Sequence, residues 1–411
     1  MGCSNNLGQS QPELDQNPQS LKIENETKGL NYQKDSLALV AIYNATNGNQ
    51  WHHKTNWLKE GVSIKNWYGI KTAIIDGEER VTDVRLGGNR LSGFIPKEIG
   101  DLTALRTLNL SENYKLGGTI PDELYNLRHL EVWKMRFSDV HGSLSPKIGN
   151  LTKIDSLDLW GAPWDLTQLN YVTKDERTLL SGTIPAEIGK LTNATYIVLG
   201  RNKFTGEIPN ELGNLTNLTY LDIAGCKLSG KLPETLGNLK SLSTLFVSEN
   251  ELSGELPSQM GEMANLREFY ADENKLTGTI PSSFANLKKL LRLALNDNQL
   301  SGQLPDVVGQ IESLGLLYLE NNKFEGEIPT SLGGVHQPHL ISVRLSNNNL
   351  TGPLPARVPH DYIVNGYNYG VIYTTFYVDG NRLSGTIPSS YYVDGQLKEG
   401  VLPQQTGYEL N

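Results

Sequence analysis

The stretch Leu218-Thr-Tyr-Leu-Asp-Ile-Ala-Gly-Cys226-Lys-Leu-Ser-Gly230-Lys-Leu-Pro233 is one copy of a 24-residue repeat that runs through most of this 411-residue chain. The shared pattern is Leu-x-x-Leu-x-Leu-x-x-Asn-x-Leu-x-Gly-x-Ile-Pro, and Cys226 occupies the Asn position of this copy. A period of this length with Leu at these spacings is typical of a solenoid, whose stacked coils share one core. Twelve copies align on the Asn position, which falls at Asn89, Asn113, Ser138, Thr178, Asn202, Cys226, Asn250, Asn274, Asn298, Asn322, Asn348 and Asn381.

Each repeat contains the pattern of a short strand. Leu221 and Ile223 alternate with Tyr220, Asp222 and Ala224, as expected for a strand with one buried face. Strands of successive coils are predicted to pair in parallel, because each coil must bury its apolar side against the next. The Asn position follows the strand, where the chain turns inward and an amide can satisfy buried backbone groups.

Cys226 is therefore interpreted as a structural residue. The repeat pattern accepts Asn or Cys at this turn, so the thiol is predicted to be a buried member of the Asn ladder and not a nucleophile.

The Gly-x-Ile-Pro element resembles the plant-type subclass of leucine-rich repeats, and the resemblance extends from about Val81 to Pro388. Proteins of this subclass include plant receptor ectodomains and some bacterial surface proteins. The resemblance implies an α/β solenoid: a right-handed coil stack with a concave parallel sheet and short extended or 3₁₀ segments on the opposite side. It also implies a recognition surface in place of a catalytic centre.

The chain divides into four predicted segments. Residues 1–30 form a polar tether that is too poor in apolar residues to order itself. Residues 31–80 form an N-terminal cap, 81–390 the solenoid, and 391–411 a C-terminal cap that covers the apolar end of the last coil.

The N-terminal cap is predicted to contain one helix and a tryptophan cluster. Residues Asp35 to Gly48 have the apolar periodicity of a helix that ends at a glycine. Trp51, Trp57 and Trp67 follow, and they are interpreted as a plug for the first coil, with ligand contact as the lesser alternative.

Composition excludes several classes of protein. The net charge of −9 and the pI near 5.4 argue against nucleic acid as a partner, because nucleic-acid binding requires basic patches. No apolar run approaches the length of a membrane span. Only two cysteines are present, so no disulfide framework is expected, and a Cys3–Cys226 pair is disfavoured.

Cys3 leaves three interpretations open. A cysteine followed by a polar tether resembles the lipidated cysteine of bacterial lipoproteins, in which case the solenoid is anchored to the membrane through Cys3 alone. Gly2 is alternatively an N-myristoylation site, although Asn6 stands where that motif requires Ser or Thr. The third interpretation is an unmodified polar tail. The first is favoured, and it predicts a lipid-anchored protein on the outer cell surface, or else a secreted one.

No catalytic or metal-binding constellation is found in the sequence. The stretch from Gly182 to Lys190 has the wrong spacing for a phosphate-binding loop, and no Gly-x-Ser-x-Gly elbow occurs. His336 and His339 lack a third metal ligand. We therefore predict a protein that is not an enzyme and that requires no cofactor or metal.

Two interruptions break the period. About sixteen extra positions separate Trp160 from the repeat that resumes after Thr178, and Pro355 to Tyr377 is nine residues longer than a regular copy and rich in tyrosine. Insertions in repeat proteins map to loops that often lie on the binding face.

The outward strand positions carry the functional information, because they have no packing role. Exposed aromatic residues on consecutive strands exceed structural need and are typical of binding anchors, whereas the alternative is that they merely reflect β-propensity. Carboxylates beside them are predicted to form a negatively charged rim. The candidate ligand-binding residues are Trp160, Tyr196, Tyr220, Asp222, Phe246, Tyr270, Asp272, Glu273, Tyr318 and Glu320.

This surface predicts a monomeric, non-enzymatic module that binds a protein or peptide on its concave face. Two alternatives remain open at this stage. Aromatic residues beside carboxylates also suit a glycan, and an adhesion spacer or structural spacer needs no specific ligand.

Overall fold

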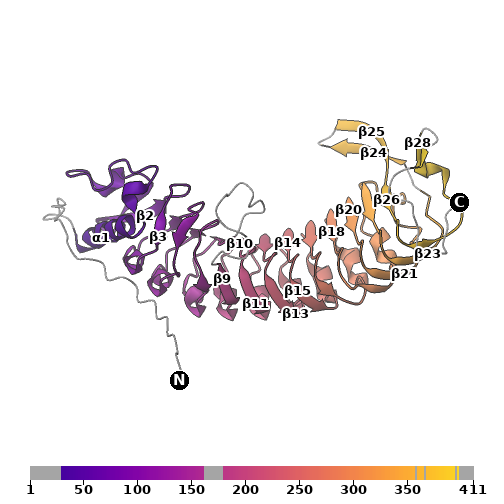
Figure 1. Cartoon of the computed structure of the whole chain (residues 1–411), viewed down its shortest axis with the longest axis horizontal. Coiled ribbons are helices and arrows are strands. Elements are labelled where there is room, and N and C mark those ends of the chain that lie inside the picture. Colours follow the sequence, from indigo (N-terminus) through magenta and orange to yellow (C-terminus); the bar gives the residue numbers. More distant parts are fainter. Residues whose placement is uncertain (1–28, 162–178, 357–358, 365–366, 394–395, 398–411) are drawn as a thin grey trace, which may run out of the picture.

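The computed structural model describes residues 29–161, 179–356, 359–364, 367–393 and 396–397. These residues form a curved solenoid in which each repeat makes one coil (Figure 1). The architecture confirms the predicted leucine-rich-repeat stack with its concave parallel sheet. Outside these residues lie positions 1–28 of the proposed tether (1–30) with Cys3, the position Thr178, and most of the terminal cap (391–411).

A 13-stranded sheet lines the concave side. Its first pair, β1 and β2, is antiparallel, and every later pair is parallel. Successive strands pair in constant register, for example Leu221 with Leu245, so that equivalent repeat positions form columns across the sheet. The strands in order are β1 (Ile70–Ile75), β2 (Glu78–Arg85), β4 (Thr107–Asn109), β6 (Val132–Lys134), β8 (Ser156–Asp158), β10 (Tyr196–Val198), β12 (Tyr220–Asp222), β14 (Thr244–Phe246), β16 (Glu268–Tyr270), β18 (Arg292–Ala294), β20 (Leu316–Tyr318), β22 (Ser342–Arg344) and β26 (Thr375–Tyr377).

Strands of two to five residues form a second layer on the flank of the coils. Three groups are hydrogen-bonded within themselves. They are β3 (Ser92–Phe94) with β5 (Lys115–Gly117); β7 (Gly142–Ser143), β9 (Leu180–Thr183), β11 (Lys203–Glu207), β13 (Lys227–Gly230), β15 (Glu251–Gly254) and β17 (Lys275–Leu276); and β19 (Ser301–Gln303), β21 (Lys323–Glu327), β23 (Asn349–Gly352) and β27 (Arg382–Leu383).

The convex side consists of one short 3₁₀ segment in most coils, which starts after the Pro of the repeat. Pro is the N-cap residue of most of these segments and has extended backbone, where its fixed φ and its missing backbone donor are tolerated. The segments are η3 (Lys97–Asp101), η4 (Asp122–Asn126), η5 (Pro146–Asn150), η6 (Ala186–Lys190), η7 (Asn210–Asn214), η8 (Glu234–Asn238), η9 (Ser258–Glu262), η10 (Ser282–Asn286), η11 (Asp306–Gly309) and η12 (Ser389–Tyr391).

The Asn position stabilises the turn after each concave strand, as predicted. The Asn250 amide donates to the carbonyl oxygens of Ile223, Val247 and Ser248 at 3.0–3.1 Å, and its Oδ1 accepts from the Leu228 N–H at 3.0 Å. One buried side chain therefore satisfies four backbone groups from two neighbouring coils. The same pattern recurs at Asn274, Asn298, Asn322, Asn348 and Asn381.

The N-terminal end of the core is covered by α1 (Leu30–Ala45), followed by η1 (Gly48–Gln50) and η2 (Ile64–Asn66). The helix begins five residues before the predicted Asp35 and ends three residues before Gly48. Trp51, Trp57 and Trp67 are 4–6% exposed, and their rings contact one another at centroid distances of 4.8 Å. This confirms that they plug the first coil.

The second interruption of the period contains a β-hairpin. Strands β24 (Pro359–Val364) and β25 (Tyr367–Tyr373) pair antiparallel and stand out from the C-terminal coils (Figure 1). A shorter pair, β28 (Tyr392–Val393) with β29 (Gln396–Leu397), follows the last coil. No helix among the described ranges combines the length and apolarity needed to cross a bilayer.

Candidate functional site

Four aromatic rings form a continuous ladder across the concave face. Tyr196 stacks on Tyr220 with a centroid distance of 4.7 Å and an interplanar angle of 18°. Tyr220 contacts Phe246 at 5.8 Å, and Phe246 stacks on Tyr270 at 4.7 Å and 15°. These side chains come from β10, β12, β14 and β16, and each is partly exposed. We call this set the aromatic ladder.

An arginine holds each end of the aromatic ladder. At one end, Arg136 pairs with Asp158 at 2.6 Å and interacts electrostatically with the Tyr196 hydroxyl. At the other end, Arg292 Nη1 donates to the Tyr270 hydroxyl at 3.2 Å. Burial raises the pKa of Tyr196, so this hydroxyl stays protonated at neutral pH and can donate or accept hydrogen bonds. The ladder is therefore fixed before any ligand arrives, which lowers the entropic cost of binding.

Tyr318 does not join the aromatic ladder, although it lies in the same column as Phe246 and Tyr270. Ala294 separates it from Tyr270, as the sequence indicated, and Tyr318 instead faces Arg344. The Arg344 guanidinium lies 4.7 Å from the Tyr318 ring centroid and 5.4 Å from that of Tyr377. The predicted platform is thus two units: the aromatic ladder and a separate cation–π cluster.

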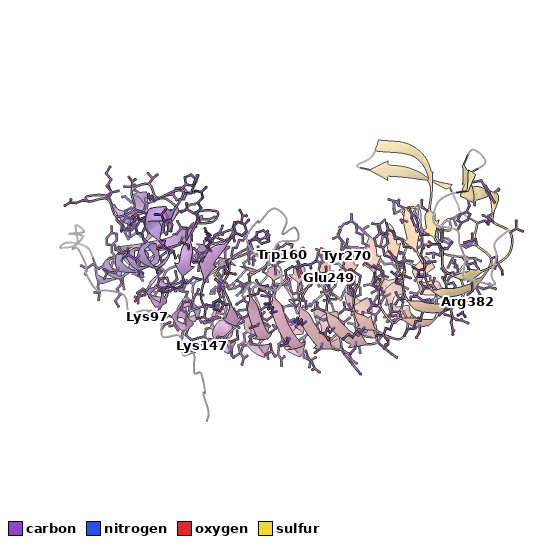
Figure 2. All side chains as sticks on the ribbon, in the orientation of Figure 1. Lys97, Lys147, Trp160, Glu249, Tyr270 and Arg382 are labelled. Atoms are coloured by element: carbon purple, nitrogen blue, oxygen red, sulfur yellow. The ribbon has the colours of Figure 1, made fainter. Side chains whose placement is uncertain are left out.

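Trp160 belongs to a third aromatic group, beside the N-terminal end of the aromatic ladder. Its ring lies 5.9 Å from Phe137, and the Arg136 guanidinium lies 5.5 Å from the Trp160 ring centroid. Arg136 therefore links Trp160 to Tyr196. In Figure 2, Trp160, Glu249 and Tyr270 lie on the concave side, whereas Lys97 and Lys147 lie on the opposite side.

Asp222 is not part of an exposed rim, and that prediction was wrong. The residue is only 7% exposed, and its Oδ1 accepts from the Ala224 N–H at 3.0 Å. Burial raises the pKa of Asp222 to about 6, although Arg201 opposes this shift. A short side chain that points outward from the sheet can be covered by larger side chains on the neighbouring strands. The position in the repeat does not show this, because it says only which way the side chain points. Carboxylates whose pKa is raised by burial are nevertheless common at functional sites, so Asp222 stays a candidate.

Asp272, Glu273 and Glu320 do lie on the concave side, at the turn that follows β16 or β20. Asp272 and Glu320 are partly exposed and Glu273 is exposed. Burial is the main cause that raises the pKa of all three carboxyls. Asp297, which the sequence analysis did not select, lies at the equivalent turn after β18 and is also exposed.

Arg201 and Glu249 form an ion pair that the sequence analysis missed. They are two repeats apart, and the intervening position is Gly225. A Cβ at Gly225 would lie 2.6 Å from Arg201 Cδ, and Gly225 also has a φ of +65°. The absence of a side chain at Gly225 therefore leaves the space through which the Arg201 side chain crosses the turn. The two residues are 48 positions apart, which is two repeat lengths, and their opposite charges at the same position of the repeat were the signal in the sequence that could have indicated this pair.

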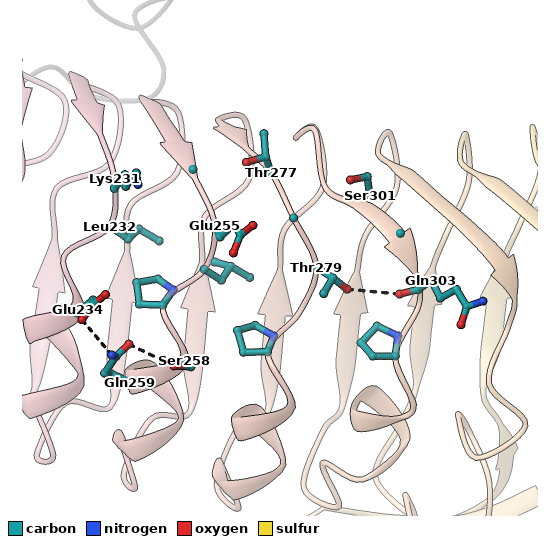
Figure 3. Close-up of a pocket in the computed structure, with 17 residues that line it drawn as sticks. Lys231, Leu232, Glu234, Glu255, Ser258, Gln259, Thr277, Thr279, Ser301 and Gln303 are labelled. Carbon is teal, nitrogen blue, oxygen red and sulfur yellow. Dashed lines mark hydrogen bonds between the residues drawn. The ribbon is translucent and has the colours of Figure 1, made fainter.

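A groove on the flank is a weaker candidate. Its volume is about 1030 Å³, and it crosses β13, β15, β17 and β19 (Figure 3). The polar lining residues bond to one another, for example Gln259 Nε2 to Glu234 at 3.0 Å and Thr279 Oγ1 to the Gln303 carbonyl at 3.4 Å. The lining contains no aromatic side chain, so this groove lacks the anchors of the concave face.

No group of three or more His, Cys, Asp and Glu residues in the described part of the chain is arranged to hold a metal. Cys226 lies in its predicted ladder position, with Sγ 3.8 Å from the carbonyl oxygens of Leu199 and Ala224. Burial raises the pKa of the Cys226 thiol to about 12, which makes it a poor nucleophile at neutral pH.

Replacing Cys226 by Asn is expected to preserve or raise stability, because Asn is the usual residue of the ladder. Replacing Cys226 by Leu should lower the free energy of unfolding by about 1–3 kcal/mol, since the carbonyl groups that face Sγ lose their polar partner. Thermal melts of both variants test this. Equal melting temperatures for Cys226→Leu and the wild type would contradict a ladder role.

Comparison with known proteins agrees with the repeat geometry. Models of the leucine rich repeat match residues 264–324, 104–127, 193–215 and 217–239. The chain is a leucine-rich-repeat solenoid, and it is similar to plant receptors of that fold. Phytosulfokine receptor 1 of Arabidopsis thaliana is 32% identical over 94 residues, which are 22% of this chain and 9% of that receptor.

Solved structures extend the similarity over most of the solenoid. The plant peptide hormone receptor RGFR1, in complex with RGF2, is 32% identical with a TM-score of 0.63, over 74% of this chain and 44% of that one. A leucine-rich-repeat protein of Leptospira interrogans is 28% identical with a TM-score of 0.51, over 66% of this chain and 61% of that one. The chain thus spans less than half of the length of these two plant receptors.

Proposed function

We propose that this chain is a non-catalytic recognition module whose concave face binds an extended peptide or protein segment across β10 to β20. The aromatic ladder is the observation that supports this function. Four ordered rings on neighbouring coils, held by an arginine at each end, form a rigid surface that has no packing role in the core. A similar solenoid, RGFR1, has been solved in complex with RGF2, which supports a peptide as ligand.

The orientation of the rings favours a peptide over a glycan. Sugars bind aromatic side chains by stacking on exposed ring faces, but the faces inside the Tyr196–Tyr220 and Phe246–Tyr270 pairs are covered by the neighbouring ring. What remains is a row of ring edges and hydroxyl groups, which suits apolar side chains and backbone carbonyls of an extended segment. The glycan alternative is therefore the second choice.

The proposed place of action is the cell surface or the extracellular space, because the plant relatives are receptors. A lipid anchor at Cys3 and action as a monomer belong to this proposal as well. Mass spectrometry of Cys3 in the native host, and the mass of the purified chain in solution, test these two points.

The ligand-binding role predicts that Tyr270→Ala weakens peptide binding by about 2 kcal/mol, or roughly 30-fold. The melting temperature should stay nearly unchanged, because the side chain points outward from the sheet. The measurement is the affinity of peptides selected from a randomised linear library on the immobilised protein, determined by calorimetry with wild type and variant.

Tyr68→Ala is the matched control, since Tyr68 is an exposed tyrosine in the N-terminal cap. It should leave peptide affinity unchanged. Selection of no peptide, together with binding on a glycan array that Tyr270→Ala abolishes, would replace the peptide by a sugar as ligand. Unchanged peptide affinity in Tyr270→Ala would instead move the site away from the aromatic ladder.

A further inference from the structure

A row of carboxylates runs beside the C-terminal part of the aromatic ladder. Asp272 and Glu320 stand two positions after Tyr270 and Tyr318 in their coils, and Glu273 and Asp297 occupy the adjoining turn positions. We call these four residues the acidic strip. It crosses three consecutive coils, those of β16, β18 and β20.

Most of the acidic strip lacks a cationic partner. Among the described residues, no Lys or Arg lies within 4.0 Å of a carboxylate oxygen of Asp272, Glu273 or Asp297, whereas neighbouring Glu249 is paired with Arg201. Glu320 lies 3.7 Å from Arg344, yet its Oε2 is buried without a hydrogen-bond partner in the described part of the chain.

Uncharged side chains hydrogen-bond to carboxylates of the acidic strip and position them without compensating their negative charge. Asn296 and Asn321 each donate to Asp297 at 2.7 Å, and Ser248 Oγ donates to Asp272 at 2.5 Å. The carboxylates repel one another, and this repulsion raises the pKa of Glu273 and of Glu320 in addition to burial. An ordered row of uncompensated negative charge is stabilised by a partner that brings positive charge.

The dimensions of the face limit the partner. Five inter-strand steps separate β10 from β20, and at ~4.8 Å each they span roughly 24 Å, the length of about seven extended residues. The strip covers two of these steps, ~10 Å. Side chains on one side of an extended segment are ~6.8 Å apart, so the strip accommodates two of them at positions i and i+2.

We propose that the partner is an extended segment of about seven residues with Lys or Arg at two alternate positions over the acidic strip and apolar side chains over the aromatic ladder. This inference rests on the proposed function, because it assigns the chemistry of the ligand to that same face. The ladder supplies anchoring area, and the acidic strip selects basic segments and accelerates their association.

The experiment uses the full chain and a randomised heptapeptide library. Peptides selected on the wild type are expected to carry basic residues at i and i+2, and their affinity should fall as salt is raised. For the best such peptide, the triple variant Asp272→Asn/Asp297→Asn/Glu320→Gln should bind about tenfold more weakly, because its two basic side chains lose the carboxylates that attract them. Replacing the two basic residues of the peptide by norleucine should remove the difference in affinity between the wild type and the triple variant.

The matched control is Glu207→Gln/Glu255→Gln/Glu327→Gln, three exposed glutamates on the flank strands that give the same change in net charge. It should bind the basic peptide like the wild type. The single variant Glu273→Gln should also weaken binding of the basic peptide. Because Glu273 is exposed, this variant is expected to fold normally and tests the same surface if the triple variant misfolds.

Two failures can be told apart. The proposal of a basic partner fails if the selected peptides depend on Tyr270 but carry no pair of basic residues. It also fails if the triple variant of the acidic strip and the flank control lose the same affinity. Either result would leave the proposal of peptide binding intact. Recovery of no peptide at all would overturn the proposed function itself.

Discussion

Replacing Asp35 by Ala is expected to lower the free energy of unfolding by about 3–5 kcal/mol, the typical cost of leaving a buried charge without its partner. Asp35 is completely buried in α1, and both of its oxygens accept from the Arg80 guanidinium at 3.0 Å. The Asp35 carboxylate also accepts from the Val81 N–H at 2.8 Å. The pair thus ties the N-terminal helix to β2, the second strand of the concave sheet.

Urea unfolding followed by tryptophan fluorescence measures this effect, since Trp51, Trp57 and Trp67 lie in the same cap. The control is the ion pair between Lys147 and Asp122, which has a similar length of 2.7 Å but is more than half exposed. Asp122→Ala should change the free energy of unfolding by less than about 1 kcal/mol. A loss in Asp35→Ala no larger than in Asp122→Ala would show that the ion pair does not hold the cap.

Replacing Asp222 by Asn should stabilise the protein at neutral pH by about 1–3 kcal/mol. The pKa of Asp222 rises from 3.8 to about 6 on folding because of burial, and two pKa units correspond to an upper value of roughly 3 kcal/mol. The Asn carbonyl retains the hydrogen bond from the Ala224 N–H, so the substitution removes the charge and little else.

The sign of the pH dependence follows from which state binds the proton. Between about pH 4 and 6, native Asp222 holds a proton that the unfolded chain has released, so stability falls as pH rises through this window. The stabilising effect of Asp222→Asn should therefore be present at pH 7.5 and absent near pH 4.

Unfolding at both pH values, with Asp306→Asn as an exposed control, tests the expectation. A less stable Asp222→Asn at pH 7.5 would mean that the carboxylate stabilises the fold. If the gain in stability is found, it implies that this carboxylate is retained for function, since it opposes folding.

The sequence by itself determined the coil stack, the concave columns and the tryptophan plug of the cap. The reason is physical: the coil stack and its columns depend on positions repeated every 24 residues, and each repeat buries the same Leu set and bonds the same turn through its Asn position. The tryptophan plug follows from a different cause, since large apolar side chains just before the first coil can cover its open end. The repeat also fixes the register between neighbouring coils. The sequence alone therefore placed Phe246 and Tyr270 in the same column of the concave sheet. Even Cys226 could be assigned, because the repeat defines its surroundings.

Only the tertiary structure decided how the outward side chains combine. Tyr196 and Tyr220 come from one column and Phe246 and Tyr270 from another, yet they join into one ladder, while Tyr318 turns to Arg344. Burial of Asp222 and the reach of Arg201 across two coils were equally hidden from the sequence. Outward side chains differ from coil to coil, so their conformations depend on neighbours that stand 24 or 48 residues away and follow no repeated rule.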